Sequence, residues 1–487
     1  MTDFTTYQAP GLYTESVPGP QLSVQAATPT AVGIFGQAIG YRTFTESLTI
    51  DPDVQDPDTS EFSAATNRTL SKAGIRTNTL VVRNPNSGEA YALNTDYTLV
   101  QVSGGASTQT DRDNLYTIKR VLEDDGGHID QGDVVEITYN YTDGDYYKAQ
   151  MFYDYDDVRD AYGSPFDALG NIQSELSLAV SFAFTNGAQR VVCAAVDPVD
   201  KTVPTMADYQ TALDHLKDDP DVAVIVPATG AQAVQALVVS HINNQARNRY
   251  ERRAVIGRDG SGSAVTHTQL IADAQAISLN RIAVASPATM KYYAPELNKE
   301  IVIGGQYLAA AIAGLSVSQS PAVPLTRKQV RGFVDVGSRE PDAQRDLQSS
   351  NGLMVVEKTR RGQLQVRHGV TTDAAGGTLT REWNVVGQED AMVYRLRAFL
   401  DSEKLIGGVV DDLTLVNVKA SADAALGSLV TDRIINGYVD LKVRQLNTDP
   451  TVVEIRYGWR PALPLNYIMV RYSVSITTGS DTAIQSV

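Results

Sequence analysis

The sequence predicts a mixed α+β and α/β protein of several domains. We expect a central α/β domain, an inserted all-β, sandwich-like domain and a C-terminal α+β domain, with extended strand arms at both ends. Three patterns carry this prediction. Strands and helices alternate between residues 190 and 285, short strands separated by turn clusters fill residues 64–147, and a strand-like run lies near each terminus. At 487 residues the chain is also too long for one core.

The first 30 residues are expected to form an N-terminal extended arm. Residues 12–17 have strand character, and prolines on both sides confine such a run to a sheet edge or a free arm. The arm residues that we single out are Leu12, Tyr13, Thr14 and Val17. Residues 31–63 are expected to belong to the core, as a short buried strand at 31–36 followed by an acidic connector at 46–63.

Residues 64–147 are expected to form an inserted β-rich outer domain. Its predicted strands are residues 79–82, 97–102, 116–122 and 134–141. Turn clusters rich in Gly, Asn and Asp separate these strands at regular spacing. This pattern is typical of a small β-sandwich.

Residues 148–369 are expected to form an α/β core domain. Its predicted strands are residues 190–196, 222–226, 253–256 and 281–285, and its predicted helices are residues 169–186, 205–217, 231–249 and 268–278. Residues 304–316 predict an Ala-rich helix or turn. Because strands and helices alternate along the chain, we expect a parallel or mostly parallel sheet.

Residues 370–466 are expected to form a C-terminal α+β inner domain. A helix is predicted at residues 389–406, and a second helix begins at its cap, Ser421, and ends near residue 436. Strands are predicted at residues 438–446 and 452–457.

Residues 467–487 form the predicted C-terminal β arm, which we call the C-terminal arm. Its apolar residues alternate so that one face carries Ile468, Val470, Tyr472, Val474 and Ile476. Two interpretations stay open. The strands at the two ends pair within their own chain, or they add to the sheets of neighbouring chains.

The charge is uneven along the chain. Residues 1–170 hold 10 Lys and Arg against 25 Asp and Glu, whereas the remaining residues hold 31 against 32. A strongly acidic part is a poor nucleic-acid binder, because phosphate requires cations, so we expect no nucleic-acid partner. No run of about 18 apolar residues occurs, so we expect no direct membrane insertion. Cys193, the one cysteine, lies in an apolar run and is expected in the core.

Enzymatic chemistry finds little support in the sequence. Asp259, Ser261 and His267 lie in one Gly-rich segment, which leaves an α/β hydrolase-like enzyme with an accessory β domain as an alternative. The nucleophile elbow of such enzymes is absent, and Ser, Gly and Asp are ordinary turn residues. There is no Walker-type loop, and the five histidines are scattered without ligand spacing. We therefore predict no catalytic, cofactor-binding or metal-binding residues.

Several segments, taken in order, resemble the contractile tail sheath proteins of myophages. The opening YQAPGLYTESVP at residues 7–18 and TAVGIFG at 30–36 resemble the start of these proteins, and GHIDQGDVVEITYNY at 127–141 is similar to the β insertion that many of them carry. A Trp-x-Val strand at 383–385, two helices and PLNYI at 464–468 resemble their end.

This resemblance implies a structural subunit that forms six-membered rings, stacked helically around a tail tube, and that contracts to drive the tube through the host envelope. It implies further partners, which are the tail tube protein and, at the ends, baseplate and tail terminator proteins. It also implies a place in the virion tail after assembly in the host cytoplasm. A sheath of a phage-derived injection system or bacteriocin is the alternative within this class.

The resemblance also gives a role to three cations of the predicted helix at residues 389–406. Arg395, Arg397 and Lys404 are candidates for contact with acidic groups on the tube. From the residues alone, a solvated helix face explains these cations as well.

Overall fold

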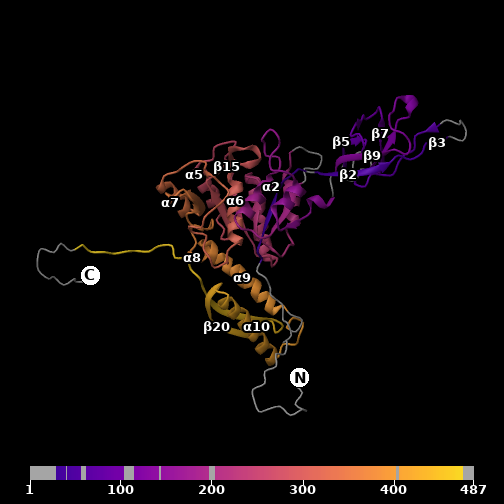
Figure 1. Cartoon of the computed structure of the whole chain (residues 1–487). Helices are drawn as coiled ribbons and strands as arrows, with labels where there is room; N and C mark the ends of the chain where they lie inside the picture. Colours follow the sequence, from indigo (N-terminus) through magenta and orange to yellow (C-terminus); the bar gives the residue numbers. More distant parts are fainter. Residues whose placement is uncertain are drawn as a thin grey trace, which may run out of the picture.

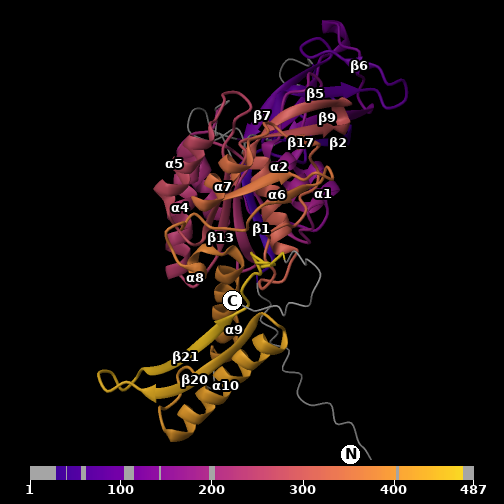
Figure 2. The same ribbon diagram turned by 90° about the vertical axis from the view of Figure 1, so that its left-hand side faces the viewer.

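The computed structural model describes residues 29–39, 41–55, 62–103, 115–141, 144–196, 203–401 and 405–474. It contains a β unit (residues 42–141), a central unit (29–39 and 144–382) and a C-terminal unit (383–461). The β unit projects from one end of the central unit and the C-terminal unit from another, so the molecule is elongated (Figures 1 and 2). The predicted class, a mixed helix-and-sheet protein of several parts, is confirmed.

An eight-stranded sheet forms the middle of the central unit. Its order is β10-β11-β1-β12-β13-β14-β18-β19, and only the two end strands pair antiparallel, which confirms the mostly parallel sheet. The strands are β10 Gln150–Phe152, β11 Val191–Val196, β1 Ala31–Gln37, β12 Val222–Pro227, β13 Arg253–Gly257, β14 Ile282–Ser286, β18 Leu353–Lys358 and β19 Leu364–Val366.

Strand β1 lies between β11 and β12 and is buried on both faces, as its small and apolar residues predict. Val32 and Ile34 belong to the core on one side of the sheet, and Phe35 belongs to the core on the other. A Cβ at Gly33 would lie 2.8 Å from a methyl of Val222, so a larger residue has no room there.

Helices cover both faces of this sheet. Helices α1, α2 and α6 share the core with one face, and α3, α4 and α5 share it with the other. Two short helices, α7 and α8, follow. The bounds are α1 Tyr155–Tyr162, α2 Glu175–Thr185, α3 Met206–His215, α4 Gln232–Arg247, α5 His267–Ile277, α6 Gly305–Val317, α7 Asp342–Ser350 and α8 Thr378–Arg381. Cys193 is fully buried, as predicted.

A small antiparallel sheet adds to the central unit beside α6. Its order is β16-β15-β17. The bounds are β15 Thr289–Ala294, β16 Lys299–Gly304 and β17 Asp335–Val336, with the 3₁₀ turn η4 at Pro295–Leu297. The sequence pattern did not predict this sheet.

The helix predicted at residues 169–186 is shorter in the structure. It begins at Glu175, with the Ser174 side chain accepting a hydrogen bond from the Ser177 N–H at its start. Before it, the Asp167 carboxylate accepts hydrogen bonds from the N–H groups of Leu169 and Asn171. These local bonds hold the preceding residues in a loop instead of a helix.

The β unit has one core shared by a four-stranded and a two-stranded sheet, in the orders β2-β9-β5-β6 and β7-β8. The bounds are β2 Arg42–Thr49, β3 Val54–Gln55, β4 Phe62–Ser63, β5 Ile75–Arg83, β6 Ala90–Tyr91, β7 Tyr97–Ser103, β8 Leu115–Arg120 and β9 Val134–Tyr141, with η2 at Glu123–Asp125 and η3 at Gly144–Tyr147 after it. Strand β2 pairs along its whole length with β9. The predicted connector at residues 46–63 is therefore partly strand, and the sheet begins before the boundary predicted at residue 64.

The C-terminal unit packs two helices against a hairpin. Its elements are α9 Trp383–Leu400, α10 Asp412–Thr431, β20 Ile435–Gln445 and β21 Val453–Pro461. Three predictions are corrected here. Residues 383–385 begin α9 and are not a strand, α9 spans Trp383–Leu400 instead of 389–406, and α10 begins after Asp411, whose side chain accepts from the Thr414 N–H. Ser421 lies inside α10 and is not its cap.

Candidate assembly site

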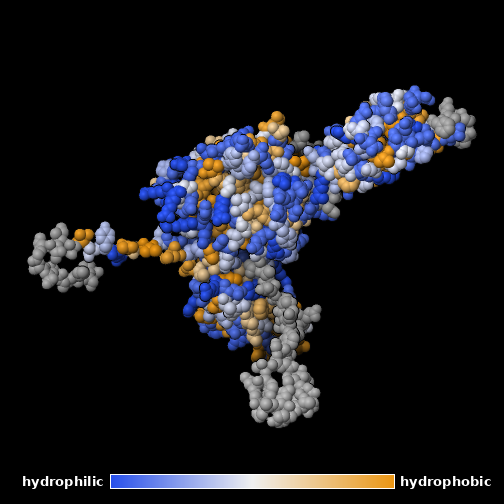
Figure 3. All heavy atoms as spheres, viewed as in Figure 1, coloured by the Kyte–Doolittle hydropathy of each residue, from blue (hydrophilic) through white to orange (hydrophobic). Residues whose placement is uncertain are grey.

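Residues 467–474, beyond β21, are exposed and rich in apolar side chains. Residues 462–474 have no strand or helix, and the end of the described chain runs away from the body as an extended thread (Figures 1 and 3). Tyr467 is 85% exposed, Val470 77% and Tyr472 85%. Ile468 and Val474 are exposed as well, whereas Ile476 and the N-terminal residues Leu12, Tyr13, Thr14 and Val17 lie outside the described residues. An apolar strand pattern that pairs with no strand among the described residues is suited to pairing with another chain.

The hairpin β20–β21 offers free edges to such a strand. The two strands form a sheet by themselves, and within the described residues neither pairs with a third strand. Leu426, Leu429 and Ile435 lie in the small core beneath the hairpin, together with residues of α9. A two-stranded sheet is marginal alone, so added strands would complete it.

Helix α9 connects the C-terminal unit to the central unit through paired charges. The Arg397 guanidinium makes a two-pronged ion pair with the Glu251 carboxylate and donates to the Arg249 carbonyl at 2.8 Å. The Glu251 side chain is 8% exposed and that of Arg397 34%. Arg–carboxylate pairs of this forked kind orient both groups, so this contact fixes the end of α9 against the central unit.

A second charged contact lies deeper, at the start of β13 and β14. Asp390 of α9 pairs with Arg281 at 2.7 Å and with Arg253 at 3.7 Å. The Arg253 guanidinium also stacks over the Trp383 ring at 4.5 Å and donates to the Trp383 carbonyl. All three charged groups are largely buried, and the two arginines offset the cost of burying the Asp390 carboxylate in the middle of α9.

The predicted tube-facing cations are engaged within the chain. Arg395 donates to Ser428 at 2.9 Å and to Asp432 at 3.0 Å, both near the end of α10, and Arg397 pairs with Glu251. Lys404 lies outside the described residues. Contact of these residues with a tube stays a prediction.

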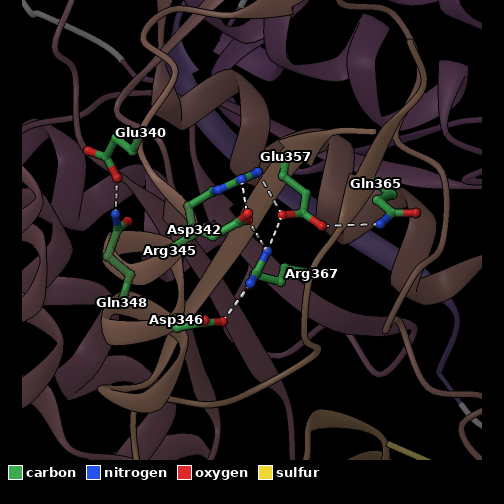
Figure 4. A network of polar contacts seen from close by, with 8 residues as sticks. All are labelled: Glu340, Asp342, Arg345, Asp346, Gln348, Glu357, Gln365 and Arg367. Carbon is green, nitrogen blue, oxygen red and sulfur yellow. Dashed lines mark hydrogen bonds and ion pairs between the residues drawn. The ribbon is translucent and has the colours of Figure 1, made fainter. Parts of the chain in front are cut away.

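Another charged network joins α7 to β18 and β19 (Figure 4). Glu357 accepts from Arg345 at 2.8 Å, from Gln365 at 3.2 Å and from Arg367, which also pairs with Asp346 at 2.5 Å. Cavities of about 380 and 480 Å³ lie beside this network and are lined mainly by polar and charged side chains. Small-molecule sites are mostly apolar, so these cavities do not fit a typical ligand site. We interpret the network as a structural contact that holds α7 against the edge strands of the sheet.

The hydrolase alternative receives no geometric support. The Ser261 hydroxyl donates to Asp259 at 2.6 Å, which also accepts from the Ser261 N–H, as in an ordinary turn. His267 faces Glu340 at 3.8 Å instead of Ser261. The three side chains therefore do not form the chain of hydrogen bonds that a triad requires. The part of the chain that the structure describes contains no cluster of three potential metal ligands, and no helix in it is long and apolar enough to cross a membrane.

The sequence patterns missed several residues of this region. Glu251 and Asp390 were not singled out because their partners lie more than 100 residues away along the chain. Three polar residues at the start of α9 and just before it, which hold residues 462–466, were missed because their partners lie 74 to 84 residues away along the chain: Glu382, Asn384 and Gln388. A signal was present, since amides within an otherwise apolar helix start need partners when they are buried.

The described chain thus combines an exposed apolar segment at residues 467–474 with a two-stranded sheet that has no third strand among the described residues, an arrangement suited to proteins that assemble from many copies. The family model "Phage tail sheath protein central domain" matches residues 202–372. The tail sheath protein of Mycobacterium phage Bxz1 is 44% identical over 574 aligned residues, which cover 99% of this chain and 98% of that protein. The chain therefore belongs to the phage tail sheath protein family, whose members are structural components of the virion tail.

Solved structures agree in fold. The anti-feeding prophage helical sheath in its contracted state has a TM-score of 0.55 at 12% identity, and the comparison covers 96% of this chain and 99% of that one. A chain of the anti-feeding prophage baseplate, 6-fold symmetrised, has a TM-score of 0.53 at 13% identity, with 97% and 100% covered. At such identities the likeness concerns the fold alone.

Proposed function

We propose that this chain is the polymerising subunit of a contractile phage tail sheath. Six copies form a ring, rings stack helically around the tail tube, and contraction of the stack drives the tube through the host envelope. The subunits assemble in the host cytoplasm, and baseplate and tail terminator proteins bind the two ends. Support comes from the 44% identity to a mycobacteriophage tail sheath protein, and from the fold shared with a helical sheath and with a chain of a 6-fold symmetrised baseplate.

One observation carries the proposed assembly mechanism. The chain has an exposed segment with a strand-like alternation, including Ile468, Val470, Tyr472 and Val474, and a two-stranded sheet that pairs with no third strand among the described residues. In the assembled sheath, the C-terminal arm of one subunit and the N-terminal arm of another add to the β20–β21 sheet of a third. Backbone hydrogen bonds supply much of such a contact, and alternate side chains fill the face against the helices. Neighbours thereby stay linked while their bodies move.

Contraction of the sheath requires no nucleotide in this proposal. Assembly leaves the extended sheath in a metastable state, and contraction lowers the free energy by increasing contact between subunits. The β unit, which lies within the acidic residues 1–170, faces outward, away from the tube. A negative outer surface favours solubility of the particle.

Point variants of the C-terminal arm test the assembly mechanism. Val470→Pro removes a backbone donor and breaks a paired strand, whereas Val470→Thr keeps a strand-forming residue at the same place. We expect both variants to melt like the wild type as unassembled chains, because Val470 is 77% exposed. Only Val470→Pro should raise the concentration needed for assembly, by about tenfold or more, which corresponds to about 1.4 kcal/mol.

Assembly is measured by sedimentation and negative-stain electron microscopy, with and without tube protein. Deleting residues 1–20 or 467–487 provides the stronger test. Each deletion should leave a folded, soluble chain that forms no long tubes. Normal tubes from both deletions would contradict strand addition by the arms.

Tube contact by Arg395, Arg397 and Lys404 is part of this proposal. Two of these cations already have partners within the chain, so a tube contact would have to share or replace Asp432 and Glu251. Exposed ion pairs with the tube would each contribute about 0–1 kcal/mol of binding free energy. A contact this weak suits an interface that is released when the sheath contracts.

A further inference from the structure

The chain leaves the C-terminal unit along three polar side chains. Asn384 and Gln388 belong to helix α9, and Glu382 is the residue before it. Ala462, the first residue after β21, donates its N–H to Gln388 Oε1 at 2.7 Å. Its carbonyl accepts from Gln388 Nε2 at 3.0 Å and from Asn384 Nδ2 at 3.1 Å. Four residues later, Asn466 Nδ2 donates to Glu382 Oε1 at 2.9 Å. We call residues 462–466 the arm root.

These bonds resemble strand pairing. The amide of Gln388 presents a donor and an acceptor side by side, as a peptide group does, and both are used by the backbone of Ala462. Asn384 and Gln388 are four residues apart and therefore share one face of α9. Gln388 is 0% exposed, Asn384 2% and Glu382 4%, so water does not compete well for these bonds.

Contact ends abruptly after the arm root. Asn466 is bonded to Glu382, but the next residue, Tyr467, is 85% exposed and Ile468 is 78% exposed. On the other side, Glu382 also contacts His368 of the central unit at 3.0 Å. The first half of α9 is buried in the central unit, where the Trp383 carbonyl accepts from Arg253. The arm root is therefore attached to the central unit through α9, and not only to the hairpin that precedes it.

We propose that Glu382, Asn384 and Gln388 form a clamp that fixes where the C-terminal arm leaves the body and sets its hinge between Asn466 and Tyr467. A pulling force on the C-terminal arm is then transmitted to the central unit through α9. The backbone hydrogen bonds between β21 and β20 do not bear this force. This mechanical role rests on the proposed function, in which the arm links neighbouring subunits. The clamp itself is a property of the single chain and is tested there.

A spin label on the arm root reports on the clamp. Leu465 is 77% exposed and lies between the two clamped residues, so Leu465→Cys accepts a nitroxide without disturbing the core. The native Cys193 is 0% exposed and stays unlabelled in the folded chain. The mobility of the label is measured by electron paramagnetic resonance on the full-length, unassembled protein.

The clamp is released by Gln388→Leu, and separately by the milder Asn466→Ala, because Asn466 is half-buried and belongs to none of the hydrophobic cores. The matched control is Gln235→Leu. Gln235 is also buried, at 5% exposed, and donates to a backbone carbonyl, that of Gly257 at 3.0 Å, but it lies on α4 away from the arm root. We expect the rotational correlation time of the label to shorten roughly twofold or more in both clamp variants and to stay unchanged in the control.

Two results would overturn the clamp. One is a label at residue 465 that is equally mobile in the wild type and in both clamp variants. The other is a label whose mobility rises as much in Gln235→Leu as in Gln388→Leu, which would assign the effect to general loosening. Since these measurements use unassembled chains, they stay valid if arm-deleted chains still form tubes, a result that would contradict strand addition by the arms and not the clamp.

Discussion

Arg397 and Glu251 form the charged contact between the end of α9 and the central unit. Arg397 carries two possible roles, an intrachain pair and a tube contact, and the forked geometry with Glu251 supports the first. A charge on a side chain that is 34% exposed still faces solvent in part, so the pair does not exclude a second partner. A charge swap separates the two roles.

We expect Arg397→Glu alone to lower the free energy of unfolding by about 1.5–3 kcal/mol, because it leaves the largely buried Glu251 opposite a like charge. The double variant Arg397→Glu, Glu251→Arg restores the pair with reversed charges and should recover most of this loss in urea unfolding. Binding of the double variant to tubes of the tail tube protein, seen by electron microscopy as decoration, then tests whether Arg397 contacts the tube. Normal decoration would contradict a tube contact by Arg397, and lost decoration at restored stability would support it.

Glu175, at the start of α2, gives the protein a pH dependence. Burial, together with the nearby Asp259 charge, raises the pKa of Glu175 to about 7. Its Oε2 is buried without a hydrogen-bond partner. Since the pKa is higher in the folded chain than in the unfolded chain, the native state binds the extra proton between about pH 4.5 and 7.

It follows that this group costs stability as the pH rises through that window, and that the cost is complete above pH 7. We expect Glu175→Gln to raise the free energy of unfolding at pH 8 by about 1–3 kcal/mol and to change it little at pH 4. The exposed Glu123→Gln serves as control. Equal gains at both pH values would show that the effect of Glu175 is not electrostatic.

Helix α9 is the element that determines how the two units meet. Its first half is buried against the central unit, and its second half carries Arg395 and Arg397, which pair with opposite units. Gly387 lies where α9 passes the guanidinium of Arg253. A Cβ at this glycine would lie 2.9 Å from an Arg253 nitrogen.

Gly387→Ala should therefore displace Arg253 from Trp383 and Asp390 and lower the free energy of unfolding by about 1–3 kcal/mol. Gly427→Ala in α10 is the matched control. No atom lies within 4 Å of a Cβ built there, so this change should raise stability by about 0.5–1 kcal/mol. Equal effects of the two substitutions on chemical unfolding would mean that α9 is not tightly packed at Arg253.

At the scale of the whole molecule, the β unit is a separate body at one end. It has a core of its own, and it begins and ends at neighbouring positions because Arg42 pairs with Tyr141 in the antiparallel register. The two ends of the unit are thus only about 5 Å apart. Its removal leaves a gap that a short turn can close.

We expect replacement of residues 42–141 by a short Gly-Ser linker to leave a folded chain with one cooperative thermal transition, because the central sheet and its helices remain complete. The variant should still form tubes if the β unit faces outward. Calorimetry and electron microscopy provide the two readouts. Loss of the cooperative transition would show that the β unit supports the central core.

Local patterns were enough to predict many elements. The small, apolar residues of β1 predict a strand buried on both faces, and the alternation of strands and helices predicts the mostly parallel sheet. The alternation from Ile468 to Val474 predicts a strand-forming segment, although it pairs with no strand in the part of the chain that the structure describes. These features follow from side-chain spacing, which the chain carries wherever it folds.

Other features were decided only by tertiary structure. The pairing of β2 with β9 joins segments about 90 residues apart, and the start of α9 at Trp383 depends on burial against Arg253 and Ser316. Arg397 meets Glu251 across 146 residues, and Gln388 meets Ala462 across 74. The sequence by itself determined most of the strands and helices of the central unit and the strand-like alternation at residues 468–474. Tertiary structure alone decided which charges and amides are paired, because a buried polar group is stabilised by whichever partner the fold brings within hydrogen-bond distance.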